Sequence, residues 1–370
     1  MELAIGFVAG IVVIAVIVYL VLRFYPPLGG RPSRESKRRM EESPNRINGR
    51  FEYPIPTDMG MSIGETTKVM IDFIKGNPNG KPKLPVPTVP LTARQIQSNE
   101  EHAKAIWFGH SAVLLHIDGK TIFIDPMLGR TPSPFALFGG KRYSRQLPIE
   151  IEDLPELDAV ILSHDHYDHL DYGTILKLKH KTKRFFVPLG VAPHLERWGV
   201  NRANISEHDW WEELEFDGLK LVTAPARHFS GRSIGDRNTT LWCSWVIIGE
   251  QAKVFFSGDS GYGPHFEQIG DKYGPFDMTF MECGQYDERW SAIHMMPEET
   301  VQAHIDVKGK VMVPIHWGAF TLALHGWTDP VEHASETARA RDVALATPRI
   351  GEVVYIRAEG YPTDAWWRHE

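Results

Sequence analysis

The hydrophobic positions of this chain form two kinds of pattern. Residues 3–22, LAIGFVAGIVVIAVIVYLVL, make one apolar run without a charged side chain. A helix of about 20 residues spans roughly 30 Å, the thickness of a bilayer core. A cleaved signal peptide has a basic start, a shorter apolar run and a small-residue cleavage site, and this segment has none of them. The pattern therefore predicts an uncleaved transmembrane anchor over residues 1–25.

From about residue 104 the apolar positions instead form short, β-branched runs. Helical patterns lie between some of them, at 171–180, 191–197, 297–307 and 330–343, and another lies at 62–75. Strands interleaved with helices predict an α/β protein with sheets covered by helices. The predicted strands are 105–108, 112–117, 121–125, 159–163, 184–188, 219–224, 245–249, 253–259, 278–282, 311–316 and 353–357.

The region between these two patterns is rich in Pro, Gly, Arg and Ser. Residues 26–60 are predicted to be a juxtamembrane linker and irregular chain, and residues 61–370 the catalytic domain, with a Pro-dense extended strap at 76–90. Basic residues follow the apolar run, so the positive-inside rule predicts a single-pass protein with its N-terminus outside and its catalytic domain in the cytoplasm. The same cations could contact anionic lipid headgroups or serve topology alone. They are Arg23, Arg31, Arg34, Lys37, Arg38 and Arg39.

Composition narrows the function classes. The chain has 370 residues and a net charge of −7, which gives no general nucleic-acid footprint. Its two cysteines, Cys243 and Cys283, lack CxxC spacing, so a disulfide scaffold and a cysteine-rich zinc module are excluded. Two distant cysteines fit a reducing compartment.

The stretch SHDHYDHLD, residues 163–171, directly follows a predicted strand. In an extended or turning segment, side chains at i and i+2 can point the same way, so His164 and His166 can share one metal ion. Asp168 and His169 would then face a second ion. Imidazole and carboxylate groups suit zinc, and also iron or manganese.

Further ligands must come from elsewhere, and three polar residues at predicted strand ends are candidates: His228, Asp259 and His316. We expect His228 to join the first ion, His316 to join the second, and Asp259 to bridge the two. The alternative for an isolated histidine at a strand end is a hydrogen-bonded structural residue.

These residues resemble the metallo-β-lactamase superfamily, whose motif HxHxDH appears at 164–169. The downstream pieces PARHF, SGDSGYG and PIHWGAF follow in the family's order. The resemblance implies a four-layered αββα sandwich with the metal ions at one edge, between the two sheets. A finer resemblance is to N-acyl-phosphatidylethanolamine-hydrolysing phospholipase D and its bacterial relatives. It rests on NGRF, WFGHSAVLL, SHDHYDHLD, GDSGYGPHFEQIGDKYGPFD, HMMPEETVQAH and IHWGAF.

The resemblance implies two divalent metal ions, with zinc favoured, on the seven positions named. It also implies that His294 lines the site near the substrate phosphate, and that Asp125 braces a ligand histidine, although Asp125 could be a turn residue before Pro126. The predicted catalytic residues are Asp168, Asp259 and His294. Gln285, Tyr286, Trp317 and Phe320 are candidates for the surroundings of the metals.

Together these features predict a membrane-anchored zinc phosphodiesterase of phospholipase D type. A hydroxide held between the ions would cleave N-acyl-phosphatidylethanolamine-like lipids to phosphatidate and N-acylethanolamine. The expected partners are the lipid bilayer and a phospholipid or other small-molecule substrate, with no nucleic acid. Two alternatives stay open: a lactonase or other hydrolase of the same fold with a soluble substrate, and a non-catalytic membrane scaffold.

Overall fold

Two seven-stranded sheets form the centre of the protein in the computed structural model, which describes residues 2–57, 61–98, 102–135 and 137–369. The first sheet has the order β16-β3-β4-β5-β6-β7-β8. Its strands are β3 (Lys104–Trp107), β4 (Val113–Ile117), β5 (Lys120–Ile124), β6 (Leu157–Ile161), β7 (Thr182–Pro188), β8 (Ile205–His208) and β16 (Val353–Tyr355).

The second sheet has the order β15-β14-β13-β12-β11-β10-β9. Its strands are β9 (Glu213–Phe216), β10 (Leu219–Ala224), β11 (Ser244–Ile248), β12 (Lys253–Phe256), β13 (Met278–Glu282), β14 (Val311–Ile315) and β15 (Ala344–Leu345). Strands β12, β13, β14 and β15 run parallel, and β9 to β12 pair antiparallel. Every predicted strand run overlaps one of the strands of the two sheets.

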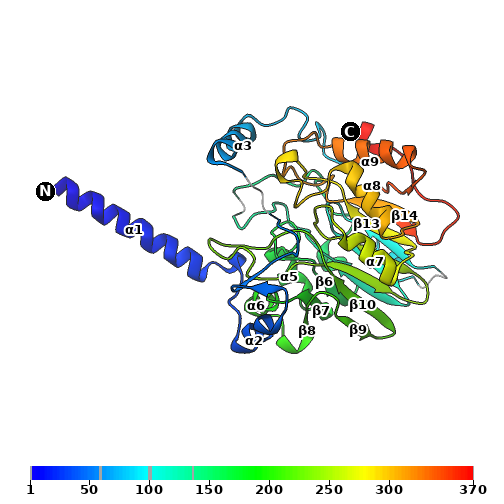
Figure 1. Ribbon diagram of the computed structural model, residues 1–370, viewed down its shortest axis with the longest axis horizontal. Coiled ribbons are helices and arrows are strands. Elements are labelled where there is room, and N and C mark those ends of the chain that lie inside the picture. The colour runs from blue at the N-terminus through cyan, green and yellow to red at the C-terminus, as the bar shows by residue number, and fades with distance from the viewer. Residues whose placement is uncertain (1, 58–60, 99–101, 136, 370) are drawn as a thin grey trace.

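Helices cover the outer face of each sheet, which confirms the predicted αββα sandwich. The helices α5 (Tyr172–Leu178) and α6 (Ala192–Arg197) share one buried cluster with the first sheet. The helices α7 (His265–Tyr273), α8 (Pro297–Asp306) and α9 (Asp329–Ala340) share another with the second sheet. Figure 1 separates these two groups of helices. Each helix layer therefore closes one side of the core.

The strand sequences explain why the core has three apolar layers, one between the two sheets and one between each sheet and its helices. Along β4, Val113, Leu115 and Ile117 belong to the cluster between the sheets, while Leu114 belongs to the cluster under α5 and α6. Successive side chains of a strand point to opposite faces. A sheet that is buried on both faces therefore needs a continuous apolar run rather than an alternating one.

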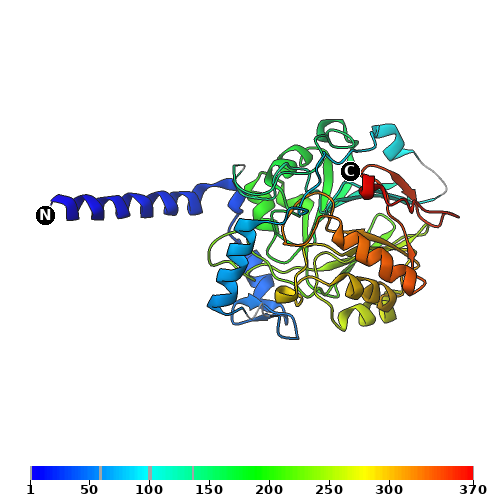
Figure 2. The ribbon, with the colours of Figure 1, turned by 90° about the horizontal axis from the view of Figure 1, so that it is seen from above.

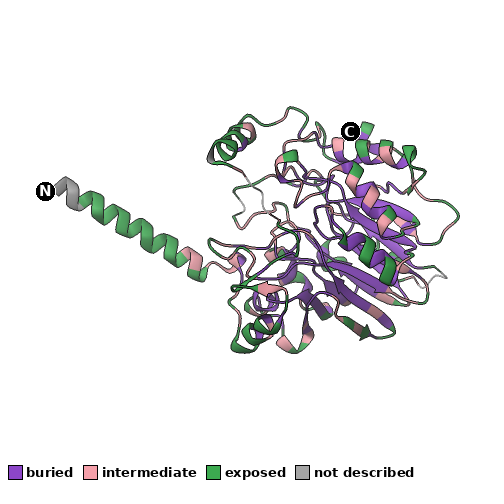
Figure 3. Cartoon of the chain, viewed as in Figure 1, coloured by how far each residue is buried: buried purple, intermediate pink, exposed green. Residues whose placement is uncertain are grey.

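The N-terminal helix α1 (Glu2–Phe24) extends away from the sandwich (Figures 1 and 2). Its segment Gly6–Phe24 has a mean hydropathy of 2.7 and is 0% buried, and Figure 3 shows it exposed except for a stretch of intermediate burial near the domain. It is the one helix in the described part of the chain that is long and apolar enough to cross a membrane. The helix is therefore compatible with a single-pass anchor.

The segment 26–60 differs from the irregular chain expected for it. A 3-10 turn at Pro26–Leu28 is followed by α2 (Arg34–Glu42) and by a hairpin of β1 (Arg46–Ile47) and β2 (Arg50–Phe51). The sequence of α2 has no amphipathic pattern of apolar residues, because Met40 is its one large buried side chain among charged residues. Met40 and Phe51 join the cluster between the sheets, so this segment packs against the domain.

Two further helices precede β3. The expected helix at 62–75 is α3 (Ile63–Lys75), and a capping box of Ser62 with Glu65 fixes its start. The short helix α4 (Ala93–Gln97) was not expected, and its Ile96 is fully buried against the first sheet.

Candidate metal centre

The candidate ligands lie just beyond the carboxyl ends of strands in both sheets. The loop from β6 to α5 carries His164, His166, Asp168 and His169, while β10, β12 and β14 lead to His228, Asp259 and His316. Because β12, β13 and β14 run parallel, their carboxyl ends meet at one edge of the second sheet. Open α/β sheets bind their ligands at such edges.

Three histidines form the first group of possible ligands. The His164 Nε2 and the His228 Nε2 lie 2.9 Å and 3.2 Å from the same atom, His166 Nδ1. The His228 Nδ1 donates to the Ile293 carbonyl at 2.9 Å, so a neutral His228 ring presents a lone pair at Nε2. Burial lowers the pKa of His228 and of His164 well below the usual value, which keeps both rings neutral.

The hydrogen bonds of Ser163 fix the tautomer of His164. The Ser163 hydroxyl donates to Asp125 Oδ2 at 2.5 Å, so it accepts from His164 Nδ1 at 2.9 Å. The His164 Nε2 is then also a lone pair directed at His166. Burial lowers the pKa of His166 to about 4, so its ring has at most one proton for two facing lone pairs. A cation bound among the three nitrogens satisfies all of them.

The second group comprises His110, Asp168, His169 and His316, whose ligand atoms lie within 4.8 Å of one another. The His169 Nδ1 donates to Asp125 at 2.8 Å, and its Nε2 lies 3.0 Å from Asp259 and 3.5 Å from Asp168. Burial lowers the pKa of His169, but these carboxylates outweigh burial and hold it well above the usual value. The position therefore attracts positive charge, which a proton or a metal cation can supply.

Asp259 lies between the two groups. Its Oδ2 is 3.7 Å from His164 Nε2 and 3.8 Å from His228 Nε2, and its Oδ1 is 3.1 Å from His316 Nδ1. The buried Oδ1 has no hydrogen-bond partner among the residues that the structure describes. Burial raises the pKa of Asp259 to about 7. An unpaired buried carboxylate oxygen among imidazoles suits a bridging metal ligand.

The structure thus brings together all the predicted ligands, and it places His294 and Asp125 around them. The His294 ring stacks on His316 with centroids 5.2 Å apart, and its Nδ1 lies 3.0 Å from Glu282 Oε2. Asp125 contacts both Ser163 and His169, as expected for a residue that braces a ligand.

The other candidates support the loops around the centre. Gln285 donates to the carbonyls of His316 and Phe320 at 3.3 Å and 3.2 Å, and Trp317 stacks on Trp107. The Phe320 ring meets His110 edge-on at 5.4 Å, and Tyr286 stacks on His325.

Three residues at the centre were missed by the sequence analysis. The His110 Nε2 pairs with Asp168 Oδ2 at 2.9 Å, and the Ser111 hydroxyl lies 3.0 Å from His316 Nδ1. Glu282 holds His294 and accepts from the backbone of Ser260 and Met295. Glu282 is the last residue of β13, which lies between β12 and β14, the strands that lead to Asp259 and His316. Parallel pairing of these three strands would have predicted that Glu282 lies beside the two ligands.

The comparisons with known proteins agree with this geometry. Residues 120–317 match the beta-lactamase superfamily domain. An uncharacterized protein of Mycobacterium tuberculosis is 40% identical over 334 residues, which cover 89% of this chain and 88% of that protein. The N-acyl-phosphatidylethanolamine-hydrolyzing phospholipase D 1 of Caenorhabditis elegans is 33% identical over 284 residues, 71% of this chain and 80% of the relative.

Among solved structures, the fold is similar to that of Igni18, a metallo hydrolase from the archaeon Ignicoccus hospitalis. The TM-score is 0.53 at 22% sequence identity, and the match covers 70% of this chain and 99% of that one.

Proposed function

This chain belongs to the metallo-β-lactamase superfamily, and from that premise we propose that it is a membrane-anchored, zinc-dependent phosphodiesterase of phospholipase D type. The family and the fold make it a metal-dependent hydrolase that uses divalent metal ions. The proposal adds the substrate, a lipid like N-acyl-phosphatidylethanolamine, and the products phosphatidate and N-acylethanolamine. The observation that carries it is the pair of buried ligand groups that Asp259 joins.

The donor set fits two zinc ions, because it consists of neutral imidazoles and carboxylates. When bound, such ions supply a hydroxide near neutral pH and neutralise the charge that gathers on a phosphodiester. One ion would be held by His164, His166 and His228, the other by Asp168, His169 and His316, with Asp259 shared.

The chain's own residues orient the ligands and the substrate. The Ile293 carbonyl and the Asp125 carboxylate each accept from a ring Nδ1, which turns the Nε2 of His228 and His169 toward the centre. Glu282 holds His294 through its Nδ1, and the His294 side chain is 12% exposed at the edge of the centre. His294 can therefore bind a phosphate oxygen and position the substrate.

The surface near the anchor supports a lipid substrate. The helix α3 lies at the end of the domain from which α1 extends (Figures 1 and 2). Its Met70, Phe73 and Ile74 are 61%, 46% and 82% exposed. An exposed apolar helix beside a membrane anchor is typical of a surface that lies against a bilayer. The basic residues after α1 support a cytoplasmic catalytic domain.

The proposal is tested with the purified full-length chain in mixed micelles that contain N-acyl-phosphatidylethanolamine. We expect release of N-acylethanolamine, about two zinc ions per chain, and loss of activity with a chelator or on His164→Ala. A zinc-loaded preparation that opens lactones and leaves the lipid intact would show the lactonase alternative instead. A chain that binds no metal would be a scaffold.

A further inference from the structure

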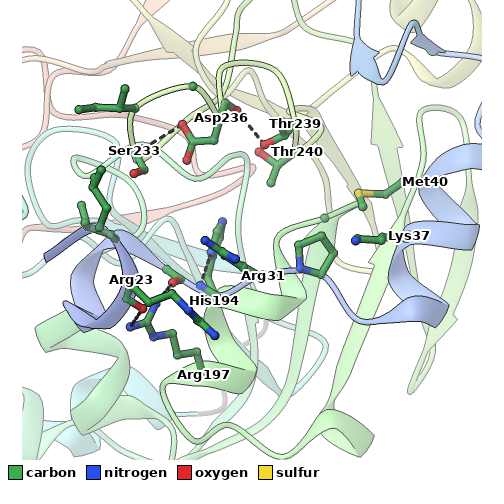
Figure 4. A pocket seen from close by; sticks show the side chains of 18 of the residues that line it. Arg23, Arg31, Lys37, Met40, His194, Arg197, Ser233, Asp236, Thr239 and Thr240 are labelled. Atoms are coloured by element: carbon green, nitrogen blue, oxygen red, sulfur yellow. Dashed lines mark hydrogen bonds between the residues drawn. The ribbon is translucent and has the colours of Figure 1, made fainter. Parts of the chain in front are cut away.

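A cavity of about 580 Å³ lies at the junction between α1 and the domain (Figure 4), and none of the residues that line it is a candidate metal ligand. Figure 4 shows Arg23, Arg31 and Arg197 on one side of the cavity and the loop from Ser233 to Thr240 on the other, with Lys37 of α2 beside them. The cationic lining residues are Arg23, Arg31, Lys37, Arg46 and Arg197, and the carboxylates are Glu41 and Asp236. Positive charge therefore dominates the lining.

No carboxylate that the structure describes pairs with these cations. In the described part of the chain, the buried Nε of Arg46 also has no hydrogen-bond partner. Arg197 donates to the carbonyls of Gly29 and Arg23. The Asp236 carboxylate already accepts from the backbone N–H groups of Ser233 and Arg232. The cavity thus presents to an anion several cationic groups that are not paired with a described carboxylate.

A second cavity of about 510 Å³ adjoins the first and is apolar. It is lined by Ile17, Val18 and Val21 of α1 and by Phe135. Both cavities are lined by Leu22, Leu28, Ser233 and Ile234. A cationic chamber therefore continues into an apolar groove along the helix α1.

We infer that the joint cavity binds an anionic glycerophospholipid of the bilayer, with its phosphate in the cationic chamber and an acyl chain in the apolar groove. Guanidinium groups bind phosphate through paired N–H donors, and basic pockets at the ends of transmembrane helices select anionic lipids. The volume is within the usual range of ligand sites. The inference rests on the membrane placement of α1 in the proposed function, and it does not depend on phosphodiesterase activity.

The lipid site is connected to the metal loop through His194, which lines the cationic chamber. The Gly30 N–H donates to His194 Nδ1 at 2.9 Å, so the proton of a neutral ring is on Nε2, which lies 3.4 Å from Asp165 Oδ2. Asp165 stands between His164 and His166. A Cβ on Gly29 would lie 2.1 Å from His194 Nδ1, so only glycine permits this approach. A lipid headgroup that orders residues 28–32 would therefore fix the position of His194, and through it the position of Asp165 in the metal loop.

The test compares two double variants of the full-length chain, delipidated in detergent and titrated with dioleoylphosphatidylglycerol or dioleoylphosphatidylcholine. Arg31→Gln with Lys37→Gln removes two cations from the chamber. Arg34→Gln with Arg38→Gln removes two from the same segment outside it. We expect the wild type to prefer phosphatidylglycerol and the first variant to bind it roughly 25-fold more weakly, since each of the two cations near a lipid surface contributes about a factor of five. The control variant should keep the wild-type affinity.

Binding is measured by native mass spectrometry, so it is read independently of any catalytic activity. Equal binding of the two lipids by the wild type, or equal losses in the two variants, would overturn the inference in favour of diffuse surface attraction. Titration with sodium phosphate distinguishes a lipid from a free anion, and competition by phosphate at the same concentration as the lipid would also overturn it. All four substituted side chains are exposed, so both variants are expected to fold.

Discussion

The metal centre and the junction at α1 are both rich in charged groups, but they hold them in opposite ways. At the centre, His169 and Asp125 have 0% exposed side chains and fix each other through a hydrogen bond. At the junction, Arg31 and Lys37 are exposed, and neither forms an ion pair with a carboxylate among the residues that the structure describes. Charges removed from water interact strongly and hold their geometry, while exposed charges are screened over about 10 Å. The first arrangement suits bond cleavage, and the second suits contact with a fluid lipid surface.

Arg232 connects the two regions. Its Nε and one terminal nitrogen donate to the Pro27 carbonyl at the junction, at 3.2 Å and 2.9 Å. Its other terminal nitrogen donates to the carbonyls of Asp165, within the metal loop, and of Leu170, directly after it. The guanidinium also lies 4.0 Å above the Tyr167 ring. One buried side chain thus ties the end of the anchor to the loop that carries the ligands.

The largest effect is expected at the bridging position, from Asp259→Asn. The amide has no charge to share between two ions, so the zinc content should fall and activity should drop to the level of the chelated enzyme. Without metal, the variant should be at least as stable as the wild type, because a buried carboxylate is costly to fold. Elemental analysis and thermal unfolding measure both. A variant that unfolds before it loses zinc would contradict the assigned role.

A smaller loss is expected when a ligand is kept but its brace is weakened, in Asp125→Asn. This change weakens the acceptor of the His169 Nδ1 proton, so zinc affinity should fall by roughly 10- to 100-fold. Competition with a chromogenic chelator measures it. Asp153→Asn, at an exposed position, is the control and should leave the affinity unchanged. Equal affinities for all three proteins would make Asp125 a turn residue only.

The connection between the regions is tested by Arg232→Lys. A lysine keeps the charge but cannot reach the carbonyls of Pro27, Asp165 and Leu170 together. Each buried acceptor left unpaired costs about 1–3 kcal/mol, so the midpoint of thermal unfolding should fall by several degrees. Turnover should fall with it. Arg184→Lys, exposed on β7, is the control. If Arg232→Lys lowers stability and leaves turnover intact, the two regions act independently.

A weaker and more selective effect is expected on α3. Ile74→Gln changes a side chain that is 82% exposed, so stability should stay within about 0.5 kcal/mol of the wild type. Activity on lipid vesicles should fall on the order of fivefold, as expected for about 1 kcal/mol of lost apolar contact. Hydrolysis of soluble bis-p-nitrophenyl phosphate should not change. Ile305→Gln on α8, which lies away from α1 in Figures 1 and 2, is the control, with a side chain that is 36% exposed.

The same contrast explains what the sequence could predict. The sheets were predictable because strands buried on both faces leave nearly continuous apolar runs, as in β14 and, apart from His116, in β4. The edge strand β9, ELEF, was missed because only Phe216 of it is buried. The helix α2 was missed because it buries one methionine among charges. At these places tertiary packing, not local pattern, decides the structure.

The candidate site follows a similar division. The residues of the 163–171 segment share one loop, so their convergence was readable from spacing. His110 was not, because its contact with Asp168 depends on a left-handed backbone at φ 55° and on pairing with Trp317 across the fold. Arg232 was missed for the same reason, because its partners are backbone carbonyls that no sequence motif marks. The domain boundaries, the ligand assignments and the cytoplasmic orientation stay predictions.

The smallest effect is expected at the junction loop, in the pH dependence of stability. Burial raises the pKa of Asp236 above 3.8, although the backbone N–H groups of Ser233 and Arg232 oppose the shift. A carboxyl group with a raised folded-state pKa contributes stability that is fully present below the unfolded-state pKa. That stability is lost as the pH rises through the folded-state value. Asp236→Asn cannot ionise, so its free energy of unfolding should fall less than that of the wild type as the pH rises from 3.8. Urea titrations across this range measure the two slopes. Equal slopes would mean that Asp236 ionises as freely in the folded chain as in the unfolded one. The Asp236 carboxylate would then be solvated in the folded protein, like the exposed cations of the junction.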